Sequence, residues 1–238
     1  MTNNIILDLK NIHLRLKSND FEVKILNGID LKVVKGKAVA ILGASGSGKS
    51  SMMSVMNGLE RQTEGSVMVA GHTLDKMNED ELALFRRDNI GIILQAFHLI
   101  PTMTAIENVA VPLELAGIAD AEEKAKAMLI EVGLEHRMDH YPTQLSGGEQ
   151  QRVAIARAMA PEPEILFADE PTGNLDGKTG HNIIELIFAL KTRNNATLIL
   201  ITHDQELAAK CDEVIHIEDG LITDNLNVHD NEGQKVAE

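Results

Sequence analysis

The sequence has one cysteine, no tryptophan and a deficit of basic side chains. Because Cys211 is the only cysteine, no intrachain disulfide can form, which indicates a reducing compartment. The 22 Lys and Arg residues stand against 36 Asp and Glu, a net charge of −14 that disfavours nucleic acid as a partner. The same acidity suits docking onto the basic cytoplasmic loops of a membrane protein.

Long apolar runs are also missing, since no stretch approaches the roughly 20 residues that a membrane-spanning helix needs. Residues 1–8 lack the basic and apolar parts of a signal peptide. We therefore expect a cytoplasmic protein that another chain would have to hold at a membrane. With 238 residues, 44% of them hydrophobic, the chain suits one large domain or one core with a smaller inserted subdomain.

Hydrophobic periodicity predicts an α/β chain with a helical middle part, about residues 104–160. Apolar residues alternate through residues 5–16 with one register change, as in a strand. Asp219-Gly220 is typical of a two-residue hairpin turn. The last dozen residues are polar and acidic, and we expect them to fray. The other expected strands are 29–33, 38–42, 65–71, 90–94, 165–168, 197–202, 214–217 and 221–222, and the clearest helices are 78–87, 122–132 and 182–190.

A glycine-rich turn lies between an apolar strand and a helix. Its residues are Gly43, Ala44, Ser45, Gly46, Ser47, Gly48, Lys49 and Ser50, with Ser51 next. Glycines let backbone N–H groups converge on phosphate oxygens, and the helix N-terminus adds partial positive charge. The pattern predicts a nucleotide site in which Lys49 reaches the β- and γ-phosphates and the Ser50 hydroxyl holds Mg²⁺. The alternative is a glycine-rich turn with an accidental lysine.

Two adjacent carboxylates, Asp169 and Glu170, follow the apolar strand 165–168. Charges on a buried parallel strand belong at its carboxyl end, where ligands bind in open α/β sheets. Neighbouring strand residues point to opposite sides, so one carboxylate can serve Mg²⁺ while the other faces the attacking water. We assign Asp169 to the metal and Glu170 to the general base. The alternative is a solvated strand end.

The stretch Leu145–Gln150 has two interpretations that can both hold. Ser146 and Glu149 have the spacing of a capping box that begins a helix. Gly147 and Gly148, which a cap does not need, would let an oxyanion approach the helix N-terminus closely.

Over roughly residues 5–222 the chain resembles ABC-type ATPases, through motifs in that family's order: the glycine-rich loop, Gln95, Leu145–Gln150, Asp169-Glu170, Asn174–Asp176 and His203. The resemblance implies a P-loop NTPase (RecA-like) core with an antiparallel β subdomain and an inserted α-helical subdomain. We expect a single ABC ATPase domain, residues 1–238. Its parts would be a core of about 1–95 and 161–222, a helical subdomain of about 96–160 and an acidic C-terminal tail of about 223–238.

The family's mechanism, carried onto these residues, implies ATP hydrolysis at a site shared by two copies of the chain. In a head-to-tail pair, Ser146 and Gly148 of one copy would bind the γ-phosphate of the ATP held by the other. Gln95 would sense Mg²⁺ and water, His203 would help Glu170 to position the water, and Asp176 would couple the two sites.

Residues 95–109 and 168–176 resemble the macrolide-export and lipoprotein-release branch of transporter ATPases. This branch implies a motor subunit at the cytoplasmic face of the inner membrane, bound to a permease of few helices and driving export or extraction of hydrophobic, lipid-like cargo. The alternative is a soluble ABC ATPase of the repair, translation or iron–sulfur assembly type. The lack of heptads, of a second core and of basic charge disfavours it.

One position departs from the family's pattern, because Leu16 stands where an aromatic residue usually stacks on adenine, and Phe21 is the nearest ring in sequence. We expect weak discrimination between nucleotide bases. Residues 98–100 are expected to face the permease, or else to be plain core. Six further histidines show no metal-ligand spacing: His72, His136, His140, His181, His216 and His229.

Overall fold

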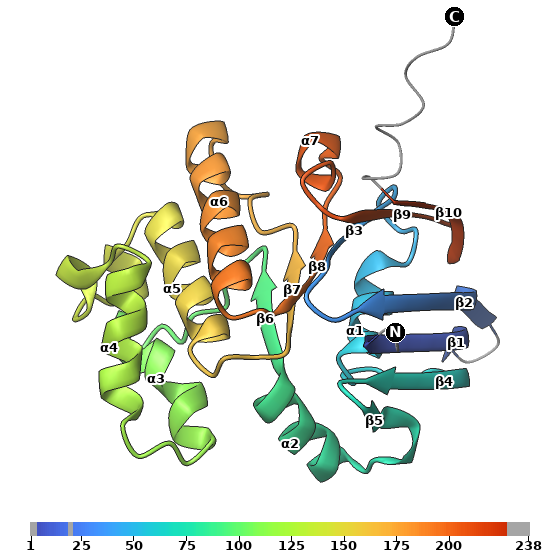
Figure 1. Ribbon diagram of the computed structural model, residues 1–238, viewed down its shortest axis with the longest axis horizontal. Coiled ribbons are helices and arrows are strands. Elements are labelled where there is room, and N and C mark those ends of the chain that lie inside the picture. The colour runs from blue at the N-terminus through green and yellow to red at the C-terminus, as the bar shows by residue number, and fades with distance from the viewer. Residues whose placement is uncertain (1–3, 19–20, 228–238) are drawn as a thin grey trace, which may run out of the picture. The chain divides into compact units, whose positions relative to one another are not determined.

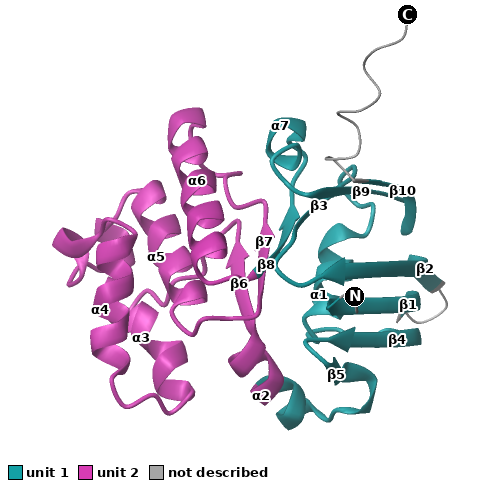
Figure 2. Ribbon diagram, viewed as in Figure 1, with its two compact units in different colours: residues 1–83, 197–238 teal, residues 84–196 magenta. Residues whose placement is uncertain are grey.

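The computed structural model describes residues 4–18 and 21–227. The chain forms two compact units (Figure 2): unit 1 takes residues 1–83 and 197–238, and unit 2 takes residues 84–196. The division into a core and a helical subdomain at about residues 96 and 160 stays a prediction. Most of the acidic tail, residues 228–238, lies outside the described residues.

Unit 1 contains an antiparallel sheet whose strands lie side by side in Figure 1. The alternating leucines put one face of the first strand into the core, with Leu7 and Leu9 fully buried. The expected register change is present between Leu9 and Ile12, where Asn11 has φ 50°, but it is not the only one. The pairing with β2 also shifts between Ile5 and Leu7, between Ile12 and His13, and between Leu14 and Arg15. In sheet order the strands are β2 (Phe21–Val34), β1 (Ile5–Ser18), β4 (Glu64–Val69) and β5 (His72–Thr73).

The parallel strands of unit 1 form its second layer. β3 (Ala38–Leu42) is buried at every residue and lies between β8 (Thr197–Ile201) and β9 (Glu213–Glu218), parallel to both. The continuous apolar runs of β3 and β8 suit strands that are covered on both faces. The helical elements that begin in this unit are α1 (Lys49–Met56), η1 (Leu74–Lys76), α2 (Glu79–Asn89) and α7 (Gln205–Ala208).

The predicted hairpin turn is confirmed between β9 and β10 (Leu221–Asn227). Asp219 and Gly220 have φ values of 47° and 74°, the two positive angles that a type I′ turn requires. β10 continues five residues beyond the predicted end at Ile222, because backbone pairing with β9 carries polar residues that show no apolar alternation.

Unit 2 pairs β6 (Ile90–Leu94) with β7 (Ile165–Asp169) in parallel. Its middle part is helical as predicted, and α3, α4 and α5 pack against one another (Figure 1). The helix predicted at residues 182–190 is longer in the structure and spans Gly177–Arg193 (α6), since its polar first turn carries no apolar signal. The helical elements are α3 (Ala105–Leu115), α4 (Ala121–Glu131), η2 (Glu135–Arg137), η3 (Pro142–Gln144), α5 (Gly147–Met159) and α6 (Gly177–Arg193).

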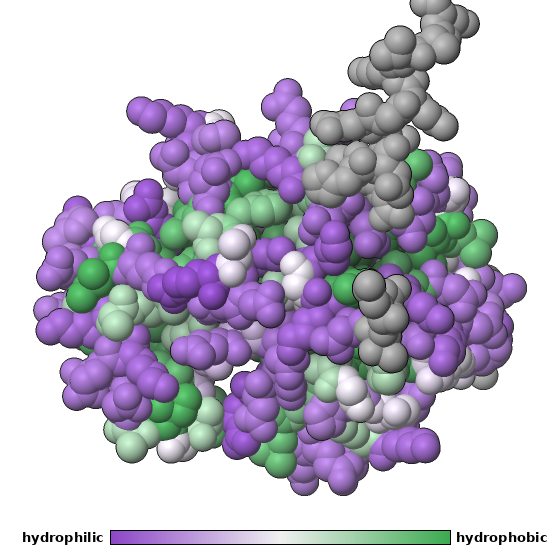
Figure 3. Space-filling view, in the orientation of Figure 1, coloured by the Kyte–Doolittle hydropathy of each residue, from purple (hydrophilic) through white to green (hydrophobic). Residues whose placement is uncertain are grey.

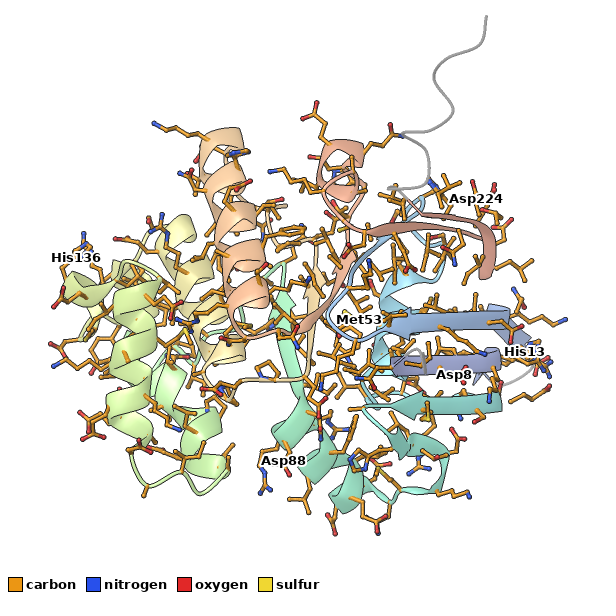
Figure 4. The ribbon with its side chains drawn as sticks, viewed as in Figure 1. Asp8, His13, Met53, Asp88, His136 and Asp224 are labelled. Carbon is orange, nitrogen blue, oxygen red and sulfur yellow. The ribbon has the colours of Figure 1, made fainter. Side chains whose placement is uncertain are left out.

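The surface agrees with the acidic, polar composition. On the face seen in Figure 3, hydrophilic side chains predominate and the hydrophobic patches are small. Every helix among the described residues is too short or too polar to cross a bilayer. The methionines of α1 are core residues, and Figure 4 shows Met53 among the packed side chains of unit 1, only 4% exposed.

Candidate functional site

The glycine-rich loop has the predicted strand–loop–helix setting within unit 1. β3 ends at Leu42, and α1 begins at Lys49. Gly48 precedes the helix with φ 106°, a conformation that side chains rarely adopt. A Cβ on Gly43 would lie 2.3 Å from the backbone oxygen of Ile217. The backbone therefore turns in a space that only glycine fits, and the N–H groups at the start of α1 stay open to an anion.

The polar groups of this loop are set for a negatively charged ligand. Lys49 Nζ donates to the backbone oxygens of Gly43 and Ala44, at 2.9 and 2.7 Å. Among the described residues, the Ser47 hydroxyl is buried without a hydrogen-bond partner. An unsatisfied buried hydroxyl is costly, so a bound phosphate oxygen would relieve it. Ser50, the second residue of α1, is exposed at the same helix end.

His203 lies at the same edge of the sheet as the glycine-rich loop. β8 runs parallel to β3 with Ile201 opposite Ile41, and the Thr202 amide donates to the Ile41 oxygen at 3.3 Å. The carboxyl ends of the two strands therefore coincide. Unit 1 thus brings the loop and His203, whose side chain is exposed, together.

Unit 2 gathers Gln95, Asp169 and Glu170 at the ends of β6 and β7. Leu94 pairs with Asp169, so Gln95 and Glu170 both follow the same sheet edge. Glu170 has φ 45°, a strained value of the kind that clusters at functional sites. Asn174 Nδ2 donates to the Gln95 backbone oxygen at 2.8 Å. Strand register therefore brings three residues that are far apart in the sequence to one edge of the sheet.

The Leu145–Gln150 stretch forms the predicted capping box at the start of α5. The Glu149 carboxylate accepts from the Ser146 amide and hydroxyl, both at 2.8 Å, and from Arg137 Nε at 2.9 Å. These hydrogen bonds, the Ser146 amide first, lower the pKa of Glu149 from 4.5 to about 2. A Cβ on Gly148 would lie 2.6 Å from Thr179 Cγ2, so this helix end packs too closely for a side chain.

Asp176 caps α6 next to that helix end. Its carboxylate accepts from the Thr179 amide at 3.0 Å, and this hydrogen bond lowers the pKa of Asp176. A Cβ on Gly147 would lie 3.5 Å from Leu175 Cδ2, so the residues before α6 pack against the first turn of α5. The structure therefore collects the predicted site residues as two groups, one in each unit.

Gln151 supports the backbone next to Glu170, a role that the sequence analysis did not predict. Gln151 is fully buried on α5, and its Nε2 donates to the Pro171 oxygen at 2.7 Å, directly after Glu170. A glutamine among the apolar residues of a helix was the available signal. Its partner is 20 residues away, which local patterns do not reveal.

The remaining predicted features stay apart from these groups. Leu16 is 48% exposed on β1, and its position next to adenine stays a prediction. The Phe21 side chain is not among the described side chains, so its contact with adenine also stays a prediction. Within residues 4–18 and 21–227, no three His, Cys, Asp or Glu side chains gather as a metal site would require. His136, labelled near the outer helices in Figure 4, is one of these histidines.

Three relatives match most of this chain. YbbA of Escherichia coli (strain K12), described as an uncharacterized ABC transporter ATP-binding protein, is 44% identical over 91% of this chain and 96% of its own length. LolD of Acinetobacter baylyi (strain ATCC 33305 / BD413 / ADP1), a lipoprotein-releasing system ATP-binding protein, is 40% identical over 93% of this chain and 98% of its own length. MacB of Shigella flexneri, a macrolide export ATP-binding/permease protein, is 42% identical over 92% of this chain but 34% of its own length.

A solved structure agrees. The dimeric post-hydrolysis state of the ATP-binding cassette MJ0796 bound to ADP and Pi has a TM-score of 0.87 and 37% identity, covering 93% of this chain and 98% of that one. The predicted fold class, ATPase activity and resemblance to the export and lipoprotein-release branch are confirmed. Residues 26–173 match the family described as ABC transporter, and the chain belongs to that family as an ATP-hydrolysing cassette.

Proposed function

We propose that this chain is the motor subunit of an inner-membrane transporter, held at the cytoplasmic face by a permease of few helices. Two copies would close on ATP and Mg²⁺ and drive export or extraction of hydrophobic, lipid-like cargo. The observation that carries the proposal is the grouping of Gln95, Asp169 and Glu170 by the β6–β7 register. The names of LolD and MacB, lipoprotein-releasing and macrolide export, support the class of cargo.

The glycine-rich loop, residues 43–51, and the unit 2 residues Gln95, Asp169 and Glu170 would have different roles in phosphoryl transfer. The loop amides and Lys49 would hold the phosphates, where the orphaned Ser47 hydroxyl marks room for an oxygen. Ser50, Gln95 and Asp169 offer hydroxyl, amide and carboxylate oxygens, the hard donors that Mg²⁺ prefers. When bound, the ion would neutralise charge that develops on the phosphates.

The attacking water is the task of Glu170 and His203. Glu170 would accept its proton as general base, and His203 would orient it and stabilise charge on the γ-phosphate. Ser146 and Gly148 of the second copy would complete the site, with Asp176 coupling the two sites. A single chain would then bind ATP yet barely hydrolyse it, so turnover per chain should rise with protein concentration.

Hydrolysis by the Glu170→Gln variant tests the catalytic assignment. We expect turnover to fall by about 10²–10⁴-fold with ATP binding retained, because only proton transfer is removed. Glu122→Gln, an exposed site on α4, is the control and should keep wild-type turnover. Removal of Mg²⁺ with a chelator should abolish hydrolysis. Unchanged turnover of Glu170→Gln would take Glu170 out of this role.

Purification from solubilised membranes tests the transporter assignment. The chain should copurify with an integral membrane protein. Recovery free of any membrane partner would favour a soluble repair, translation or iron–sulfur assembly ATPase instead.

A further inference from the structure

The loop that follows Gln95 contains a strained turn. The His98 amide donates to the Ala96 oxygen at 2.5 Å, a three-residue γ-turn centred on Phe97. Phe97 and His98 have φ values of 57° and 48°. A γ-turn with positive φ is rare and strained, and two successive non-glycine residues in this region are unfavourable. Such a backbone persists only where its surroundings hold it.

Arg157, on the last turn of α5, holds this turn from one side. Its Nη1 donates to the His98 oxygen at 2.6 Å and its Nη2 to the Phe97 oxygen at 2.8 Å. Burial lowers the pKa of Arg157, although a guanidinium stays charged at neutral pH. A half-buried cation that gives both ends of its fork to two adjacent carbonyls is a specific clamp, because the planar fork fixes the direction of both.

The start of the same loop is fixed separately. Asn174 Nδ2 donates to the Gln95 oxygen, and a Cβ on Gly173 would lie 2.7 Å from Gln95 Nε2. The backbone of residues 95–98 is therefore tied at both ends by side chains of unit 2. These contacts limit the directions in which the Gln95 side-chain amide can point.

We infer that Arg157 is a positioning residue for Gln95, an inference that rests on the proposed role of Gln95 at the metal. Arg157 and the cap residue Ser146 belong to one helix, about 16 Å apart along its axis. A helix is stiff over this length. Movement of the Ser146 end is therefore transmitted to the residue 95–98 turn through the guanidinium.

Kinetics of Arg157 variants test the inference. Arg157→Ala should lower kcat by about 10- to 100-fold, the effect of two lost bonds from a charged donor, with the KM for ATP within about twofold. Arg157→Lys keeps the charge but not the fork, and should stay at least about fivefold below wild type. Arg152→Ala removes an arginine of the same helix whose single bond, to the Val132 oxygen at 3.2 Å, does not reach the residue 95–98 turn, and it should keep kcat within about twofold.

Fluorescence gives a readout that does not depend on hydrolysis. The chain lacks tryptophan, so Phe97→Trp supplies a single emission from the turn itself. Adding Arg157→Ala should shift this emission to longer wavelength and raise quenching by acrylamide, while adding Arg152→Ala should change neither. An unchanged emission would overturn the clamp.

The outcomes separate this inference from the proposed function. If the wild type does not hydrolyse ATP, the proposed function fails while the fluorescence test still stands. If Gln95→Ala slows hydrolysis but Arg157→Ala does not, only the inference fails. If Arg157→Ala does not fold, as judged by circular dichroism, Arg157→Lys decides, and a wild-type kcat for that variant overturns the inference.

Discussion

Replacing Glu149 by Gln should destabilise the protein by an amount that depends on pH. The ionised carboxylate accepts two hydrogen bonds from Ser146 and one from Arg137, whereas an amide keeps one acceptor oxygen and no charge. The pKa of Glu149 lies near 2 instead of 4.5, which corresponds to about 3 kcal/mol of stability for the ionised form. Because the side chain is 22% exposed, solvent screening reduces this to about 1–2 kcal/mol.

The sign follows from the lowered pKa of Glu149. A group with a folded pKa below its unfolded value stabilises the fold above the unfolded pKa, here about 4.5. That contribution is lost as the pH falls from about 4.5 towards 2. The difference between wild type and Glu149→Gln should therefore be constant from pH 7 to about 5 and fall to less than half by pH 3.

Urea unfolding followed by circular dichroism between pH 7 and pH 3 measures this difference, and other carboxylates cancel in the comparison. Glu107→Gln is the matched control. Glu107 forms the same capping box on α3, but only the hydrogen bonds of Thr104 lower its pKa, and its side chain is exposed. Its effect should be smaller at every pH. A difference for Glu149→Gln that is absent, or equally large at pH 3 and pH 7, would refute the reasoning.

Three further predictions follow from single positions. The fully buried side-chain amide of Asn108 accepts from the Ile100 amide and donates to three backbone oxygens. Asn108→Ala should therefore lower the free energy of unfolding in urea by about 3 kcal/mol, whereas Asn182→Ala, at an exposed position, should leave it nearly unchanged. Gly148→Ala should lower the unfolding temperature through its clash with Thr179, and Thr179→Ser, which lacks the clashing methyl, should restore most of it; no restoration would point to another contact. If Leu16 occupies the position expected for an adenine-stacking ring, hydrolysis of GTP should rival that of ATP, and a strong ATP preference abolished by Leu16→Ala would contradict this.

The sequence predicts the parts of this fold whose chemistry is local. Ser146 and Glu149 are three residues apart, and Asp219-Gly220 is a dipeptide, so both follow from short-range geometry. Gln151 and Arg157 bind backbone oxygens 20 and about 60 residues away, and no pattern near either residue reports its partner. Asn108 lies between these cases, because a polar residue on an apolar helix face signals burial while its bonds do not show.

The turn of the last hairpin also supports the glycine-rich loop. The Gly220 amide donates to the Ser47 oxygen at 3.0 Å, and a Cβ on Gly220 would lie 2.2 Å from the Ile25 oxygen. The loop is thus synthesised long before the turn that supports it. On the ribosome, some 170 further residues must be added after residue 50 before Gly220 can hydrogen-bond to the Ser47 oxygen. Nucleotide binding can then report that synthesis has passed residue 220, and a chain truncated before that residue should bind nucleotide more weakly than the full chain, because the Gly220–Ser47 bond cannot form.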